Sequence, residues 1–135
     1  MIRFRQFHRL AISFLMLLAA FVQPARSEIP DAVINAISAG NSAVLAGYFN
    51  PSLTLAILEK EDIYTRQQAE LIMKDFFARN TPVSFTVLHK GGKEGSQYAI
   101  GNLVTPNDVF RVTIYLKVKD NKTLIHQLRF EKDGE

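Results

Sequence analysis

The stretch from Val109 to Lys119 (VFRVTIYLKVK) decides the fold class, because apolar and polar residues alternate along it without a break. Alternation with a period of two predicts a β-strand with one buried face and one solvated face. The predicted core face carries Phe110, Val112, Ile114, Leu116 and Val118, and the predicted outer face carries Arg111, Thr113, Tyr115, Lys117 and Lys119.

Three further strands are predicted around this one, over residues 83–89, 97–104 and 123–130. Each is short, rich in β-branched and aromatic residues, and bounded by turn residues, which is typical of antiparallel strands with one buried face. The turns are predicted at the glycines 91, 92 and 95 and at residues 105–108.

The last hairpin leaves its register open between two alternatives. A three-residue loop over 120–122 would turn Leu124 and Leu128, with His126 between them, toward the core. A two-residue loop would turn Ile125, Gln127 and Arg129 inward instead. We favour the three-residue loop, because it buries apolar side chains rather than a guanidinium group.

Helices are predicted before the strands. One begins at Asp31 and stops at Gly40, and a second, capped by Asn41, ends at Asn50-Pro51. A short buried strand over 53–58 and a charged connection over 59–62 follow.

The strongest helix pattern begins at Thr65, where Thr65 and Gln68 fit a capping box. An apolar stripe then faces the core, and it comprises Ala69, Ile72, Met73, Phe76 and Phe77. Asn80 and Pro82 are expected to end this helix.

This order predicts an α+β domain with helices packed on one face of an antiparallel sheet. It resembles the cone-shaped fold of nuclear transport factor 2, also described as cystatin-like, which ketosteroid isomerase and scytalone dehydratase share. This resemblance implies that the antiparallel sheet is curved. More narrowly, the chain resembles an exported family of unknown function from Gram-negative bacteria. The motifs that carry this likeness are Ile29-Pro30-Asp31, Tyr48-Phe49-Asn50, Lys60-Glu61, Gln67-Gln68-Ala69 and Phe76-Phe77. The likeness covers about residues 28–133, and it implies the fold without carrying over any catalytic residue.

The first 27 residues are predicted to be a signal peptide, and residues 28–135 a single domain. A basic start is followed by 13 apolar residues, Leu10 to Val22, and then by Ala25-Arg26-Ser27, which is the layout of a secretory leader. The alternative is an uncleaved anchor, but a helix of that length covers only about 20 Å of the roughly 30 Å hydrocarbon core. We therefore expect cleavage near Ser27, export to the periplasm or the medium, and membrane contact only during export.

The net positive charge of the whole chain comes from the predicted leader. The 135 residues contain 16 basic and 13 acidic side chains, for a net charge of +3, and no cysteine. Four basic residues and none of the acidic ones lie in the leader, so residues 28–135 carry a net charge of −1. A near-neutral domain favours no nucleic-acid partner. The lack of cysteine excludes thiol catalysis and Cys-ligated metals, and packing alone must hold the domain together.

Two residues are the candidate ligand contacts. His126 is predicted to face the concave side of the sheet, which lines the pocket in the resembled fold, so it could bind ligand or act as a base. The alternatives are a histidine at the wide, solvated end of the sheet, or one hydrogen-bonded to a backbone carbonyl group. Tyr98 could orient a ligand through its hydroxyl group, or it could simply pack.

Catalytic and metal-binding patterns are not found in the sequence. No Asp or Glu occupies a predicted core-facing position of the long strands, whereas isomerase chemistry of the ketosteroid kind needs a carboxylate in an apolar pocket. His89 and His126 lack the spacing of metal ligands, and Glu59, Glu61 and Asp62 fit a solvated turn better than a cation site. We therefore expect no catalytic residue, metal or cofactor.

The outer face of the sheet is the candidate interface. Arg111, Tyr115 and Arg129 are predicted to share it, and Tyr and Arg are enriched at protein interfaces. Two hypotheses for this face remain equally favoured: it forms the interface of a homodimer, or it is simply in contact with solvent.

These patterns favour a non-enzymatic binding module for a small apolar ligand or a peptide. The alternatives are a small isomerase, dehydratase or hydrolase that uses His126 and a tyrosine, or an assembly subunit that uses the outer face.

Overall fold

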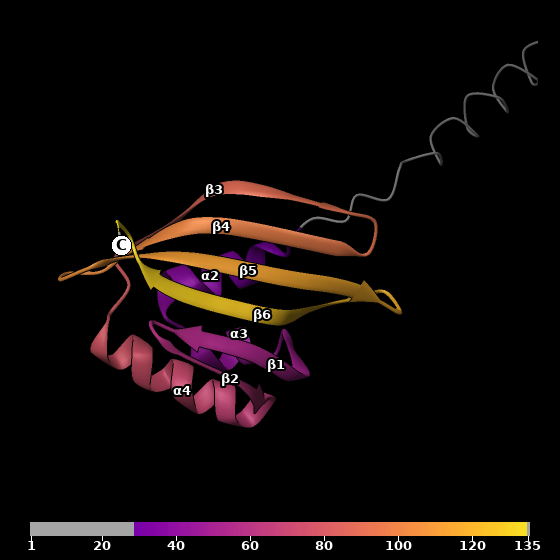
Figure 1. Ribbon diagram of the computed structural model, residues 1–135, viewed down its shortest axis with the longest axis horizontal. Coiled ribbons are helices and arrows are strands. Elements are labelled where there is room, and N and C mark those ends of the chain that lie inside the picture. Colours follow the sequence, from indigo (N-terminus) through magenta and orange to yellow (C-terminus); the bar gives the residue numbers. More distant parts are fainter. Residues whose placement is uncertain (1–28, 135) are drawn as a thin grey trace, which may run out of the picture.

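The computed structural model describes residues 29–134, and Figure 1 shows how its elements are arranged. This part of the chain forms two helices, two strands, a third helix and then four strands. In chain order they are α2 (Asp31–Ala39), α3 (Ser42–Ala46), β1 (Phe49–Ile57), β2 (Lys60–Thr65), α4 (Arg66–Arg79), β3 (Ser84–Lys93), β4 (Ser96–Val104), β5 (Val109–Lys119) and β6 (Lys122–Lys132).

The strands form one sheet in the order β2-β1-β6-β5-β4-β3. Every neighbouring pair is antiparallel except β1 and β6, which run parallel. The predicted α+β class is therefore confirmed, but the sheet is mixed rather than wholly antiparallel. A parallel pair needs a long connection, and here the connection contains all four other strands and α4.

The core lies between the helices and one face of this sheet. In Figure 1, α2 and α3 lie behind the long strands, and α4 crosses beside β1 and β2. The alternating face of β5 is buried as predicted from Phe110 to Leu116, and the core stripe of α4 is buried at Ala69, Met73, Phe76 and Phe77. In residues 29–134, no helix has both the length and the apolar composition that a membrane span requires.

Two expectations about residues 47–65 are wrong. The second helix ends at Ala46, and β1 already begins at Phe49 and runs through Pro51. The ladder with β6 is irregular between Phe49 and Thr54, which is where a strand tolerates a proline that has no N–H to donate. Residues 60–62 of the charged connection predicted over 59–62 are instead the first half of the edge strand β2. Charged side chains are common on edge strands because they discourage pairing with other chains.

The β5–β6 hairpin combines the two registers that the sequence left open. Its loop has two residues, Asp120 and Asn121, both with positive φ (53° and 61°), so the predicted three-residue loop is wrong. Near this turn Leu116 faces Ile125, but a register shift at His126 brings Ile114 opposite Leu128. This β-bulge adds one residue to β6 and so lets a two-residue turn coexist with buried leucine and phenylalanine farther along the strand.

A second bulge and a glycine bend the other half of the sheet. The β3–β4 register shifts between Val87 and His89. Opposite this bulge, a Cβ atom at Gly101 would lie 2.5 Å from the Thr86 carbonyl oxygen and 2.8 Å from the Phe85 ring. Only glycine fits such a close approach, and bulges with strand glycines are the usual source of sheet curvature.

Candidate functional site

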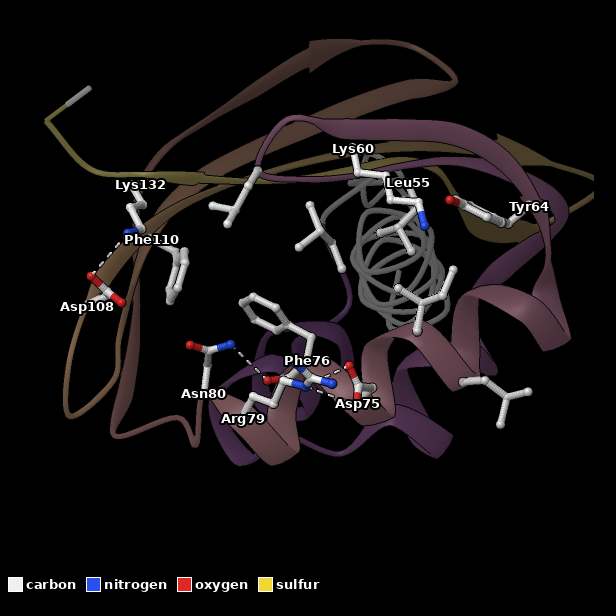
Figure 2. Close-up of a pocket in the computed structure, with 14 residues that line it drawn as sticks. Leu55, Lys60, Tyr64, Asp75, Phe76, Arg79, Asn80, Asp108, Phe110 and Lys132 are labelled. Carbon is white, nitrogen blue, oxygen red and sulfur yellow. Dashed lines mark hydrogen bonds and ion pairs between the residues drawn. The ribbon is translucent and has the colours of Figure 1, made fainter.

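A pocket of about 660 Å³ lies between α4, the β1–β2 hairpin and the adjoining ends of β5 and β6. We call it the α4 pocket. Figure 2 shows α4 below it and the β1–β2 hairpin above it. Its volume is within the range of about 300–1,000 Å³ that is typical of small-molecule sites.

The floor of the α4 pocket is apolar and aromatic. Leu55, Phe76 and Phe110 line it and are almost fully buried. The Phe76 ring packs edge-on against Phe110, with ring centroids 5.2 Å apart, and lies 4.8 Å from Phe130. Edge-to-face packing holds each ring in a fixed orientation, so the floor is a preformed apolar surface.

The mouth of the pocket exposes two leucines. Leu71 on α4 has 67% of its surface exposed and Leu58 in the β1–β2 turn has 45% exposed, and both line the pocket. Leu58 also has φ = 56°, a conformation that costs a bulky residue of the order of 1–3 kcal/mol. The hydrogen bond from its N–H to the Phe130 carbonyl oxygen, at 2.8 Å, holds the backbone there. An exposed leucine in a strained turn is the kind of feature found at ligand sites.

Charged side chains surround this apolar surface. On α4, Arg79 forms an ion pair with Asp75 at 3.1 Å, and across the pocket Lys132 approaches Asp108 at 3.9 Å. Lys60 and Tyr64, both from β2, complete the polar rim. The pocket therefore offers an apolar interior with polar groups at its edge.

His126 does not lie where the sequence predicted. The bulge in β6 removes it from the core-facing alternation, and it is half-buried and absent from the residues that line the α4 pocket. Burial, together with the positive charge of Lys117, lowers the pKa of His126 below 6.5. Ile125 and Leu128 on either side are fully buried, so the bulge turns His126, together with Gln127, away from the core and toward the outer face.

Tyr98 is likewise on the outer face. The buried residues of β4 are Ala99, Gly101 and Leu103, so the alternation turns Tyr98 the other way. Its ring lies 6.4 Å from the Tyr115 ring and covers Gly91 on β3. Ligand binding by His126 and Tyr98 stays a prediction, and it would concern the outer face rather than the α4 pocket.

The three candidate interface residues share the outer face, and two of them form ion pairs within the chain. Arg111 is 3.2 Å from Asp133, and Arg129 is 2.6 Å from Glu61. The Arg129–Glu61 pair connects β6 to β2 across Ala56 of β1. Tyr115 has 44% of its surface exposed and packs beside Tyr98. The homodimer through this face stays a prediction.

Sequence reasoning missed the α4 pocket because its residues come from four stretches of the chain that are far apart in sequence, over 55–64, 71–80, 108–110 and at Lys132. One signal was available at Leu71, which lies outside the apolar stripe of its helix and is exposed. An apolar residue on the wet side of a helix breaks the pattern and indicates a functional position or an interface. Among residues 29–134, no group of three or more His, Asp or Glu side chains could hold a metal ion.

Comparison with known proteins places this architecture in a family. Residues 30–131 match the domain of unknown function DUF4783. The crystal structure of a DUF4783 protein from Bacteroides ovatus is similar, with 36% identity and a TM-score of 0.77, covering 82% of this chain and 100% of that chain. A DUF4783 protein from Bacteroides uniformis also has 36% identity, a TM-score of 0.76, and coverage of 80% of this chain and 100% of its own.

More distant structures share only the fold. A designed protein named Rd1NTF2_04 with long sheet has 15% identity and a TM-score of 0.62, covering 74% of this chain and 94% of its own. This likeness supports the nuclear transport factor 2-like fold. No curated protein matches the chain. The match over residues 30–131 and the 36% identity show that the chain belongs to the DUF4783 family.

Proposed function

We propose that this domain binds a small, largely apolar ligand in the α4 pocket, without catalysing a reaction on it. The observation that carries the proposal is the preformed floor of Leu55, Phe76 and Phe110 beneath a cavity of about 660 Å³. Contact between water and the apolar wall of an open cavity is unfavourable in free energy. A ligand that fills the cavity removes from water both the wall of the cavity and its own apolar surface.

An enzyme that uses His126 has less support. A general base must lie within hydrogen-bond reach of the proton that it removes, and His126 is not among the residues that line this pocket. The carboxylates at the rim, Asp75 and Asp108, each face a cation, and Asp75 is well exposed whereas Asp108 is partly exposed. The desolvated carboxylate of isomerase chemistry has no counterpart among the lining residues that the structure describes.

Export of the domain is part of the same proposal. The predicted signal peptide falls outside the described residues, and its support is the sequence pattern alone. A ligand of this domain would then be met in the periplasm or outside the cell.

The pocket can be tested with a series of straight-chain alcohols on the protein beginning at residue 28. The Bacteroides ovatus chain is matched over its whole length by 82% of this one, so a piece of this size folds on its own. Each methylene that enters the pocket contributes about 0.8 kcal/mol, so affinity measured by calorimetry should rise about fourfold per carbon until the cavity is full.

A matched pair of variants assigns that binding to the pocket. Leu71→Lys places a charge at the mouth and should weaken binding of the longer alcohols about tenfold, since an ammonium group must be desolvated as the chain enters. Ile63→Lys is the control, because Ile63 has 70% of its surface exposed but does not line the pocket. Equal losses in the two variants, or no binding of any alcohol, would rule out the proposed site.

A further inference from the structure

The charges at the rim of the α4 pocket do not balance. Three cations line it, Lys60, Arg79 and Lys132, against two carboxylates. Arg79 pairs with Asp75 and Lys132 with Asp108. Lys60 has no ion pair or side-chain hydrogen bond with any residue between 29 and 134.

Lys60 and a hydroxyl group face the same space. Side chains two and four residues apart on a strand point to the same side, so Lys60, Asp62 and Tyr64 share one face of β2. Lys60 and Tyr64 line the pocket, whereas the exposed Asp62 carboxylate accepts a hydrogen bond from the Ile63 N–H and does not line it. Figure 2 shows the Lys60 ammonium group directed toward the side of the pocket where the Tyr64 hydroxyl group lies. The side chains of Leu55 and Ile72 line the pocket with them. An ammonium donor and a hydroxyl donor thus stand beside an apolar cavity.

We propose that the ligand is an anionic amphiphile of the fatty-acid class, whose carboxylate binds Lys60 and Tyr64 while its alkyl chain occupies the apolar floor. The inference rests on the proposed function and deepens it. A carboxylate can accept one hydrogen bond from the Lys60 ammonium group and another from the Tyr64 hydroxyl group, and such charge-assisted bonds are the strong ones.

The ion pairs at the rim favour an anion over a cation. A cationic ligand would have to draw Asp75 or Asp108 away from its partner and would meet Lys60 as a like charge. An anionic ligand needs no existing pair to break, because it binds Lys60, the lining cation that has no ion pair within residues 29–134. A wholly neutral ligand would leave Lys60 partly desolvated without compensation.

The test compares three probes that share one alkyl chain: decanoate, decanol and decyltrimethylammonium. Calorimetry at low salt should give decanoate an affinity about tenfold higher than that of decanol, and the ammonium probe the lowest affinity. The advantage of decanoate should shrink as salt is raised, because the rim is exposed and its charges are screened.

Lys60→Met should remove that advantage, lowering decanoate affinity about tenfold to the level of decanol and leaving decanol binding unchanged. Tyr64→Phe should lower decanoate affinity by a smaller factor. Lys74→Met is the matched control, because Lys74 is an exposed lysine of α4 that does not line the pocket. Thermal melts of the three variants should coincide with that of the parent protein, since each alters a rim or surface group.

The outcomes separate the two proposals. Equal affinity of decanoate and decanol for the parent protein, or a preference for the ammonium probe, would overturn the anionic amphiphile and leave an apolar pocket. Retention of the decanoate preference in Lys60→Met would overturn it as well. Failure of all three probes to bind would overturn the proposed function along with it.

Discussion

At the residue scale, His126 shows how a single inserted residue changes the chemistry available to a side chain. The alternation of β6 predicts that His126 faces the core, between Leu124 and Leu128. The bulge instead turns Ile125 inward and leaves His126 half-buried near Lys117. The position of a bulge depends on how the two strands and their turn fit together. The amino-acid sequence of β6 alone therefore did not predict the bulge.

The first prediction at this scale is that the pKa of the His126 imidazole group is lower than 6.5. Desolvation and the Lys117 charge lower this pKa below 6.5, and NMR titration of the imidazole protons should show it. Lys117→Gln should raise the pKa only part of the way, because desolvation is the larger cause. In the domain, His89 is the other histidine, so the imidazole signals that remain in a His89→Gln variant belong to His126. Lys119→Gln removes a different positive charge from the same strand and is the control for Lys117→Gln. A pKa at or above 6.5 in the parent protein would place His126 in a different environment.

The same shift links His126 to stability. The unfolded chain binds the proton more readily than the folded protein, so the free energy of unfolding falls as pH drops from 6.5 to the lower folded pKa. Above 6.5 the contribution of His126 does not change with pH. A His126→Gln variant should lose this part of the pH dependence.

At the element scale, β2 and α4 show the two extremes of what local sequence determines. The residues that start α4 make a capping box: the Thr65 hydroxyl group accepts from the Gln68 N–H at 3.2 Å, and the Gln68 side chain accepts from the Thr65 N–H at 3.0 Å. Four neighbouring residues suffice for such a motif, so the sequence predicted it. β2 is mostly polar, with Ile63 as its one aliphatic residue and no apolar alternation, and it forms a strand because β1 supplies its hydrogen bonds.

The capping box of α4 can be tested by Thr65→Ala. Loss of an N-cap side chain should lower the free energy of unfolding by about 1 kcal/mol, measured by urea denaturation. Thr81→Ala, at an exposed position in the loop after α4, should change it by less than about 0.5 kcal/mol. Equal effects of the two substitutions would show that the box contributes nothing to stability.

At the scale of the whole molecule, charge is divided unevenly along the sequence. Residues 1–27, the predicted leader, carry four basic and no acidic residues, and residues 28–135 carry a net charge of −1. The hydrophobic core is built from residues between Val33 and Phe130, with Ile29 packed against it.

Processing of the leader is the prediction at this scale. Expressed from its full gene in a Gram-negative host, the protein should be recovered outside the cytoplasm with Glu28 as its first residue, as measured by intact mass. A double substitution of Leu15→Arg and Leu17→Arg should block export, because charges in the apolar segment oppose membrane insertion. A secreted product that retains residues 1–27 would contradict cleavage.

The sequence by itself determined the α+β class, the capped helix α4 and the buried face of β5. Each of these depends on periodicity or on contacts between residues near one another in the chain. The tertiary structure decided the parallel pairing of β1 with β6, the bulge at His126 and the α4 pocket. These depend on contacts between distant segments, since the rim of the pocket joins Lys60 to Lys132. A single sequence does not reveal such pairings, because its local patterns are the same whichever strands become neighbours.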